Sequence, residues 1–264
     1  MEVPLIRNYP AIDISCVFST DPAASAPGIR RDLPYLRAEY QRLDIIASAQ
    51  SPWNAFRNGL AIPEENRLLH EITRKEDSLF QWVVVDPYEP ATFWQAEALL
   101  ASPKTLGIRL PFSLRRRDIS EYMDTLLSFA AERHTAVMVL PVQLPALAAF
   151  GEKYPNVTVL IPQLCTERLD KECFAECIVH TPNLYTDTSG SPATLNNSLE
   201  FVVETCGADR VLFGTGGESP AFEKARILLS SLSREDQEKI LLHNALRVFP
   251  KLAAWMDTRK EAAP

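Results

Sequence analysis

The chain has 264 residues, of which 46% are hydrophobic and 23% are charged, as is typical of a globular protein with a large core. Its net charge of −7 and its pI near 5.3 argue against nucleic acid and anionic membrane surfaces as general partners. No apolar run approaches the roughly 18 residues that a membrane-spanning helix needs, so no membrane segment is expected.

The first residues and the cysteines predict the compartment. Residues 1–7 lack the basic stretch and the following apolar stretch that mark a secretory signal. The five cysteines form an odd set without CxxC spacing, namely Cys16, Cys165, Cys173, Cys177 and Cys206. Such a set is typical of reduced thiols, so the sequence predicts a cytoplasmic protein.

Predicted strands and helices alternate along the chain. Residues 11–18 predict the first strand, 33–43 an amphipathic helix and 44–48 the second strand, with loops over 19–32 and from Ser51. Apolar runs predict the other strands at 79–87, 105–111, 136–141, 157–164, 183–190 and 211–213. The intervening helices are expected at 63–75, 91–100, 119–134, 146–154 and 195–206.

A last helix, 235–249, is predicted after a capping box at Ser233, and a frayed polar tail is expected from Asp257. Eight strands linked by helices indicate an α/β protein with a closed (β/α)8 barrel. We expect one domain over residues 1–264, with the barrel at about 11–250.

The segment from Arg210 to Pro220 is the most distinctive in the chain. It reads Arg-Val-Leu-Phe-Gly-Thr-x-x-x-x-Pro, and Asn244-Ala-Leu-Arg-Val-Phe249 follows a helix later. This combination resembles the end of amidohydrolase-related proteins, the metal-dependent hydrolases with a TIM-barrel fold. The resemblance runs from about Asp13 to Phe249, and it implies a hydrolase with its site at the C-terminal ends of the strands.

The residues that the resemblance makes metal ligands are replaced here. The family has an aspartate directly after Gly-Thr, where this chain has Gly216. Its first strand reads Asp-x-His-x-His, and Ser15 and Val17 take the places of the histidines. Two further histidine positions, in strands five and six, fall at Leu140 and Gln163. We therefore predict no metal ligands and no cofactor.

The histidines and three of the cysteines are the remaining candidates for a metal centre. The four histidines are expected to lie away from the mouth of the barrel: His70, His134, His180 and His243. A relocated centre built on Cys165, Cys173 and Cys177 stays open, although free thiols are the simpler interpretation.

Without a metal, hydrolysis needs a carboxylate base, and Glu218 and Asp13 are the predicted catalytic residues. Glu218 is the carboxylate nearest to the replaced strand-eight aspartate, and its alternative is a solvated loop position. Asp13 is expected to point inward with Ser15 and Val17, because alternate residues of a strand share a face. Its alternative is a buried structural carboxylate.

Arg109 is the predicted cation for a substrate anion, because an arginine within a barrel strand must be paired. Its alternative partners are Asp13 and Asp86. Neutral or polar groups expected beside it as substrate-binding residues are Ser15, Gln163, Asp187 and Ser189. The basic cluster Arg115–Arg117 is either a solvated loop or a gate for an anion. Trp53 and Phe56 are candidates for a lid.

Two functions remain open on the sequence. The first is a divergent, metal-independent hydrolase for a small anionic lactone or amide, as the resemblance to the pyrone-dicarboxylate lactonase branch implies. The second is an inactive relative that binds a small ligand or serves as the partner subunit of an active paralogue. A homo-oligomer is compatible with either function.

Overall fold

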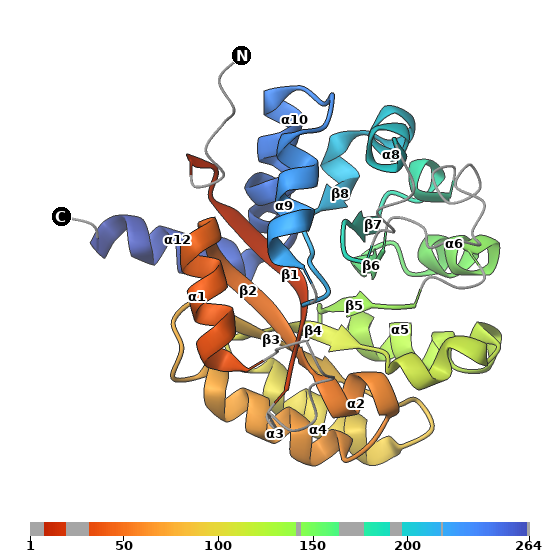
Figure 1. Ribbon diagram of the computed structural model, residues 1–264. Coiled ribbons are helices and arrows are strands. Elements are labelled where there is room, and N and C mark those ends of the chain that lie inside the picture. The colour runs from red at the N-terminus through yellow and green to blue at the C-terminus, as the bar shows by residue number, and fades with distance from the viewer. Residues whose placement is uncertain are drawn as a thin grey trace.

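The computed structural model describes residues 8–19, 32–140, 144–163, 177–190, 197–217 and 219–262. Eight parallel strands follow one another in sequence order around the molecule, with helices outside them (Figure 1). Their bounds are β1 (Ala11–Phe18), β2 (Ile45–Pro52), β3 (Leu79–Val84), β4 (Thr105–Arg109), β5 (Ala136–Met138), β6 (Val159–Ile161), β7 (Leu184–Asp187) and β8 (Val211–Leu212). The predicted single-domain (β/α)8 barrel is thereby confirmed.

Backbone hydrogen bonds close the barrel between its first and last strands. The N–H of Ile14 donates to the carbonyl of Phe213 at 2.9 Å, and the N–H of Gly216 donates to the carbonyl of Ser15 at 2.7 Å. Both bonds join β1 to the corner that follows β8. The glycine-rich segment singled out in the sequence therefore completes the barrel at its C-terminal end.

Helices connect the strands on the outside. They are α1 (Leu33–Leu43), α2 (Trp53–Asn58), α3 (Ile62–Thr73), α4 (Pro90–Leu100), α5 (Met123–Glu132), α6 (Leu144–Lys153), α8 (Ser198–Cys206), α9 (Pro220–Leu228), α10 (Arg234–Glu238), α11 (Asn244–Val248) and α12 (Pro250–Ala262). Short turns of 3₁₀-helix are η3 (Phe112–Arg116), η4 (Ile119–Glu121) and η5 (Ala208–Arg210), and η6 (Lys239–His243) is a π-helical turn. In the described part of the chain, no helix is long and apolar enough to span a bilayer.

Two local predictions are wrong. The loop expected from Ser51 is the end of β2 followed by α2. The frayed tail expected from Asp257 is helical as far as Ala262, because Pro250 opens a new helix in its first turn and Leu252 and Trp255 bury that helix against the barrel.

The barrel interior is filled at its N-terminal end. Inward-facing apolar side chains form one layered core: Ile12, Ile14, Ala47, Ala49, Phe80, Trp82, Leu106, Met138, Leu160 and Leu212. The C-terminal segment caps this core, with Trp255 edge-on to Phe80 at 5.7 Å and Phe249 edge-on to Trp82 at 5.6 Å between ring centroids. Polar side chains consequently gather at the opposite end, where the strands finish.

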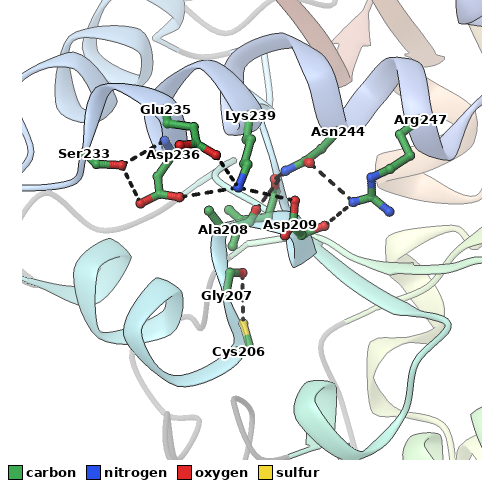
Figure 2. A network of polar contacts seen from close by, with 11 residues as sticks. Cys206, Gly207, Ala208, Asp209, Ser233, Glu235, Asp236, Lys239, Asn244 and Arg247 are labelled. Atoms are coloured by element: carbon green, nitrogen blue, oxygen red, sulfur yellow. Dashed lines mark hydrogen bonds and ion pairs between the residues drawn. The ribbon is translucent and has the colours of Figure 1, made fainter.

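A polar network ties the last helices to the start of β8 (Figure 2). Buried Asn244 donates to the carbonyls of Ala208 at 2.8 Å and Val211 at 2.7 Å. On the exposed side, Lys239 lies 3.1 Å from the carboxylate of Glu235. The amide of Asn244 satisfies two backbone carbonyls at once, so it fixes where β8 begins and hence where its C-terminal corner lies.

Candidate functional site

Asp13 lies in a closed hydrogen-bond network at the C-terminal corner. Its Oδ1 accepts from the backbone N–H groups of Thr215 at 3.1 Å and Ser15 at 3.2 Å. Its Oδ2 accepts from the hydroxyls of Thr215 at 2.6 Å and Tyr40 at 3.1 Å. Complete burial raises the pKa of Asp13 to about 6, although each of these bonds lowers it. With four donors, the carboxylate joins β1 to the strand-eight corner and to α1.

The expectation that Asp13 points inward with Ser15 is wrong, because β1 contains an irregularity. Asp13 pairs with Ser48 and Cys16 with Gln50, so three steps along β1 match two along β2. Ile14 faces the barrel core, whereas Asp13 and Cys16 both contact the Tyr40 hydroxyl of α1. The extra residue reverses the alternation, and the hydroxyl of Ser15 approaches Met138 Sδ at 3.9 Å in the interior.

Arg109, at the end of β4, is buried and only partly bonded. Its Nη1 donates to the hydroxyl of Ser51 at 2.9 Å, and its guanidinium carbon lies 3.7 Å from the ring centroid of Phe56. Its Nε is buried and has no hydrogen bond to any described residue. Burial lowers the pKa of Arg109 to about 10, and the nearby charge of Asp187 opposes that shift. The side chain is therefore a desolvated cation with donor capacity to spare.

Neither internal partner considered from the sequence pairs with Arg109. Asp13 is occupied by the bonds above, and Asp86 accepts from the N–H of Tyr88 at 2.9 Å. Among the described residues, no carboxylate oxygen lies within 4.0 Å of the Arg109 guanidinium. The charge of Arg109 is thus balanced only at longer range.

Asp187, at the end of β7, is the carboxylate that complements Arg109. Its Oδ1 accepts from the N–H groups of Ser189 at 2.7 Å and Gln163 at 3.2 Å, whereas its buried Oδ2 has no hydrogen bond. Burial raises the pKa of Asp187, and these bonds and then Arg109 lower it. The predicted substrate-binding residues Asp187, Gln163 and Ser189 are therefore in contact with one another.

Gly214 holds Ser15 beside this cluster. A Cβ at Gly214 would lie 3.0 Å from both the Asp187 carboxyl carbon and Ser15 Cβ, closer than ordinary packing allows. Only glycine lets the β8 corner approach these two side chains. Ser15, Asp187 and the corner thus meet at one point of the mouth. Predicted base Glu218 lies outside the described residues.

Glu223 is a buried carboxylate on the same side that was not predicted. It lies in the first turn of α9, directly after the β8 corner, and its Oε2 has no hydrogen bond and lies 3.9 Å from Arg226. Burial raises its pKa to about 8, and Arg226 lowers it. The sequence did contain a signal for the burial of Glu223. This residue lies four positions before buried Ile227 and therefore on the same helix face.

The described residues do not fit a metal centre of the family's kind. No group of three or more His, Cys, Asp or Glu side chains converges anywhere in the described ranges. Val17 and Leu140 are buried apolar residues. Cys165 and Cys173, two of the three cysteines considered for a relocated centre, lie outside the described residues. His134 lines a cavity of about 380 Å³ at the N-terminal end of the barrel, far from the strand-end cluster.

Comparisons with known proteins agree with this architecture. A family model described as Amidohydrolase matches residues 31–251. No curated protein matches the chain. Solved structures with the same fold include 5-carboxyvanillate decarboxylase from Sphingomonas paucimobilis, with 12% identity, a TM-score of 0.66 and coverage of 92% of this chain and 99% of that one.

Two further structures are similar over comparable lengths. The 5-carboxyvanillate decarboxylase from Novosphingobium aromaticivorans, in complex with manganese and 4-hydroxy-3-methoxy-5-nitrobenzoic acid, has 14% identity and a TM-score of 0.67, covering 92% of this chain and 97% of that one. An amidohydrolase 2 protein from Bifidobacterium longum subsp. infantis has 19% identity and a TM-score of 0.62, with 91% and 99% coverage. At these identities the likeness concerns the fold.

Proposed function

The chain belongs to the amidohydrolase family, and we propose that it acts on a small organic anion at the C-terminal end of the barrel. In this proposal Arg109 binds the anionic group and Asp187 transfers the proton. The observation that carries it is the state of two buried, oppositely charged side chains. Within the described ranges, Arg109 Nε and Asp187 Oδ2 both lack a hydrogen bond, although each group lies within electrostatic range of the other.

A bound carboxylate supplies what Arg109 lacks. Leaving a buried charged donor unsatisfied costs on the order of 1–3 kcal/mol, and a ligand oxygen on Nε removes that penalty. The guanidinium is held by Ser51 and by the face of Phe56, so its orientation is set before a ligand arrives. A planar carboxylate is the group that a guanidinium fork accepts in a bidentate manner.

Asp187 is better arranged for proton transfer than Asp13. Its Oδ1 is fixed by two backbone N–H groups, whereas its buried Oδ2 has no hydrogen bond among the described residues and keeps its acceptor capacity for a substrate proton. A pKa raised by burial makes a carboxylate a stronger base at neutral pH. Asp13, with four donors on it, acts as a positioning residue for the corner in this scheme.

We propose hydrolysis of a lactone or an amide as the reaction, with water activated at Asp187 Oδ2 and Ser15 and Gln163 orienting the substrate. The anionic nature of the substrate has support from the named ligands of relatives, which are aromatic acids such as 5-carboxyvanillate and 2,6-dihydroxybenzoate. Glu218 remains a proposed second base at the same corner.

The test begins with binding, using 2,6-dihydroxybenzoate and 5-carboxyvanillate as probes in calorimetric titrations of the full chain. Arg109→Gln should weaken binding at least tenfold, because it removes the buried charge while keeping a polar side chain. Arg67→Gln is the matched control, since Arg67 is exposed and paired with Glu64 and Glu71. Equal affinity in the Arg109 variant and the wild type would overturn the binding role.

Turnover is then measured on a panel of anionic lactones and amides, with carbon dioxide release from the two probes followed in parallel. Asp187→Asn should abolish product formation and leave probe affinity within about threefold. Carbon dioxide release without hydrolysis would replace the proposed reaction by decarboxylation. Undiminished turnover in the variant would exclude Asp187 as the proton-transferring group.

A ligand-binding protein without catalysis is the second candidate. One observation in its favour is that both carboxylate oxygens of Asp13, the retained family aspartate, already accept hydrogen bonds within the protein. The other is that apolar Val17 and Leu140 occupy two positions that carry metal ligands in the family. Binding of the probes that depends on Arg109, with no product from either assay, would select this candidate.

A further inference from the structure

A positively charged cavity lies on the rim of the barrel mouth, outside the Arg109 cluster. It has a volume of about 340 Å³ and is lined by Arg57, Phe112, Ser113, Arg115 and Arg116. Helix α2, which carries Arg57, directly follows β2, and η3, which carries the other four, follows β4 through Pro111. Both segments therefore stand at the C-terminal end of the barrel, where ligands bind in this fold.

In the described part of the chain, the cations of this rim cavity have no acidic partners. Among the described residues, no carboxylate oxygen lies within 4.0 Å of Arg57, Arg115 or Arg116, although the protein carries a net charge of −7. Some other surface arginines are paired, as Arg67 is with two glutamates and Arg133 is with Glu97. Three unpaired guanidinium groups around one cavity repel one another unless an anion joins them.

Two of the three arginines lie against one aromatic ring. Phe112 has the guanidinium carbon of Arg57 at 4.5 Å and that of Arg115 at 4.6 Å from its centroid. The ring also contacts Phe56, with 6.1 Å between the two centroids. The guanidinium groups of Arg57 and Arg115 therefore rest on a packed aromatic pair.

Close contact between α2 and η3 creates this aromatic pair. Gly59 ends α2 with a φ of 65°, and its N–H donates back to the carbonyl of Ala55. A Cβ at Gly59 would lie 2.9 Å from the hydroxyl oxygen of Ser113, so a larger residue would displace that hydroxyl. Glycine suits this position for two reasons, because it adopts the left-handed backbone without strain and has no side chain to contact Ser113.

We propose that the rim cavity is a binding site for a phosphoryl group, separate from the anion site at Arg109. Three guanidinium groups and one hydroxyl match a tetrahedral dianion, which accepts hydrogen bonds on three oxygens. A single carboxylate has too few oxygens and too little charge to engage all of these donors. The ligand is inorganic phosphate or the phosphate group of a small organic molecule.

The proposal is tested by calorimetric titration of the full chain with inorganic phosphate, and with acetate at the same ionic strength. Phosphate should bind at least tenfold more tightly than acetate. Arg57→Gln and Arg115→Gln should each weaken phosphate binding at least fivefold, and Arg67→Gln, which removes one exposed charge elsewhere, should leave it unchanged. Phosphate binding that is no tighter than that of acetate would overturn the proposal.

Two further arms separate the possible sites and sources. Arg109→Gln should leave phosphate binding within twofold, and loss of binding in this variant alone would place phosphate at Arg109 and reject the rim site. Phenyl phosphate binding more tightly than inorganic phosphate would identify an organic phosphate as the ligand, and equal or weaker binding would identify the free ion. None of these measurements depends on the proposed enzymatic activity.

Discussion

At the N-terminal end of the barrel, the ammonium group of Lys251 donates to three backbone carbonyls, those of Leu100, Ser102 and Thr105, each at 2.8 Å. At the C-terminal end, Arg109 is more deeply buried and makes one hydrogen bond, to Ser51. The N–H donors of Lys251 are thus satisfied by carbonyls of the protein, whereas those of Arg109 are satisfied only in part. This difference separates a residue that stabilises the fold from one that awaits a ligand.

The largest expected effect comes from exchanging both cations for methionine. Lys251→Met should lower the free energy of unfolding by about 3 kcal/mol, because it removes charged hydrogen bonds to three carbonyls. Arg109→Met should change it by less than about 1 kcal/mol, because few native bonds are lost and a costly buried charge disappears. Urea denaturation of both variants measures the contrast, and equal destabilisation would remove the distinction between the two ends.

The same comparison applies to two aspartates at the C-terminal end. Asp13→Asn should destabilise the protein by about 2 kcal/mol, because the amide loses the Oδ2 acceptor, and the hydroxyls of Thr215 and Tyr40 that donate to it must reorient. Asp187→Asn should cost less than about 1 kcal/mol, since its amide oxygen can keep both backbone bonds and its NH₂ replaces an oxygen without a partner. Thermal unfolding at pH 7 measures both, and a larger loss in Asp187→Asn would contradict the assignment.

A pH-dependent effect is expected from the buried carboxylate of Glu223. Its pKa is about 8 in the folded protein against an ordinary value of 4.5, so the folded state binds the proton more tightly. The stability that this proton provides is complete below pH 4.5 and is lost as the pH rises through 8. Glu223→Gln should therefore gain about 1 kcal/mol per pH unit relative to wild type between pH 5 and pH 8.

Unfolding experiments at both pH values check the Glu223 prediction. Glu97→Gln is the control, because Glu97 is exposed and pairs with Arg133 near the N-terminal end of the barrel. A difference between the two pH values that is the same for both variants would show that Glu223 has no special role.

The arrangement of strands and helices could be predicted because it depends on periodicity and local signals. The bounds of α1 agree with the sequence prediction, since Asp32 caps the helix by accepting from the N–H of Tyr35. The barrel follows from eight alternating units. These features depend on short stretches of chain, and no distant contact is needed to recognise them.

The site could be predicted only in part, because it depends on where strands depart from regularity. Arg109 was recognisable as a charged residue in an apolar strand, but its free Nε was not. Asp13 was misplaced because the extra residue in β1 changes which side chains share a face. Its partners Tyr40 and Thr215 are 27 and 202 residues away along the chain, beyond the reach of local patterns.

The aromatic cap at the base of the barrel also bears on the order of synthesis. Phe249 and Trp255 cover Trp82 and Phe80, which belong to β3 and leave the ribosome about 170 residues earlier. During translation the interior of the half-made barrel therefore has no cover at this end until the final helix emerges. The burial of Trp82 can be measured by tryptophan fluorescence in chains released at increasing length. It should then rise in one late step.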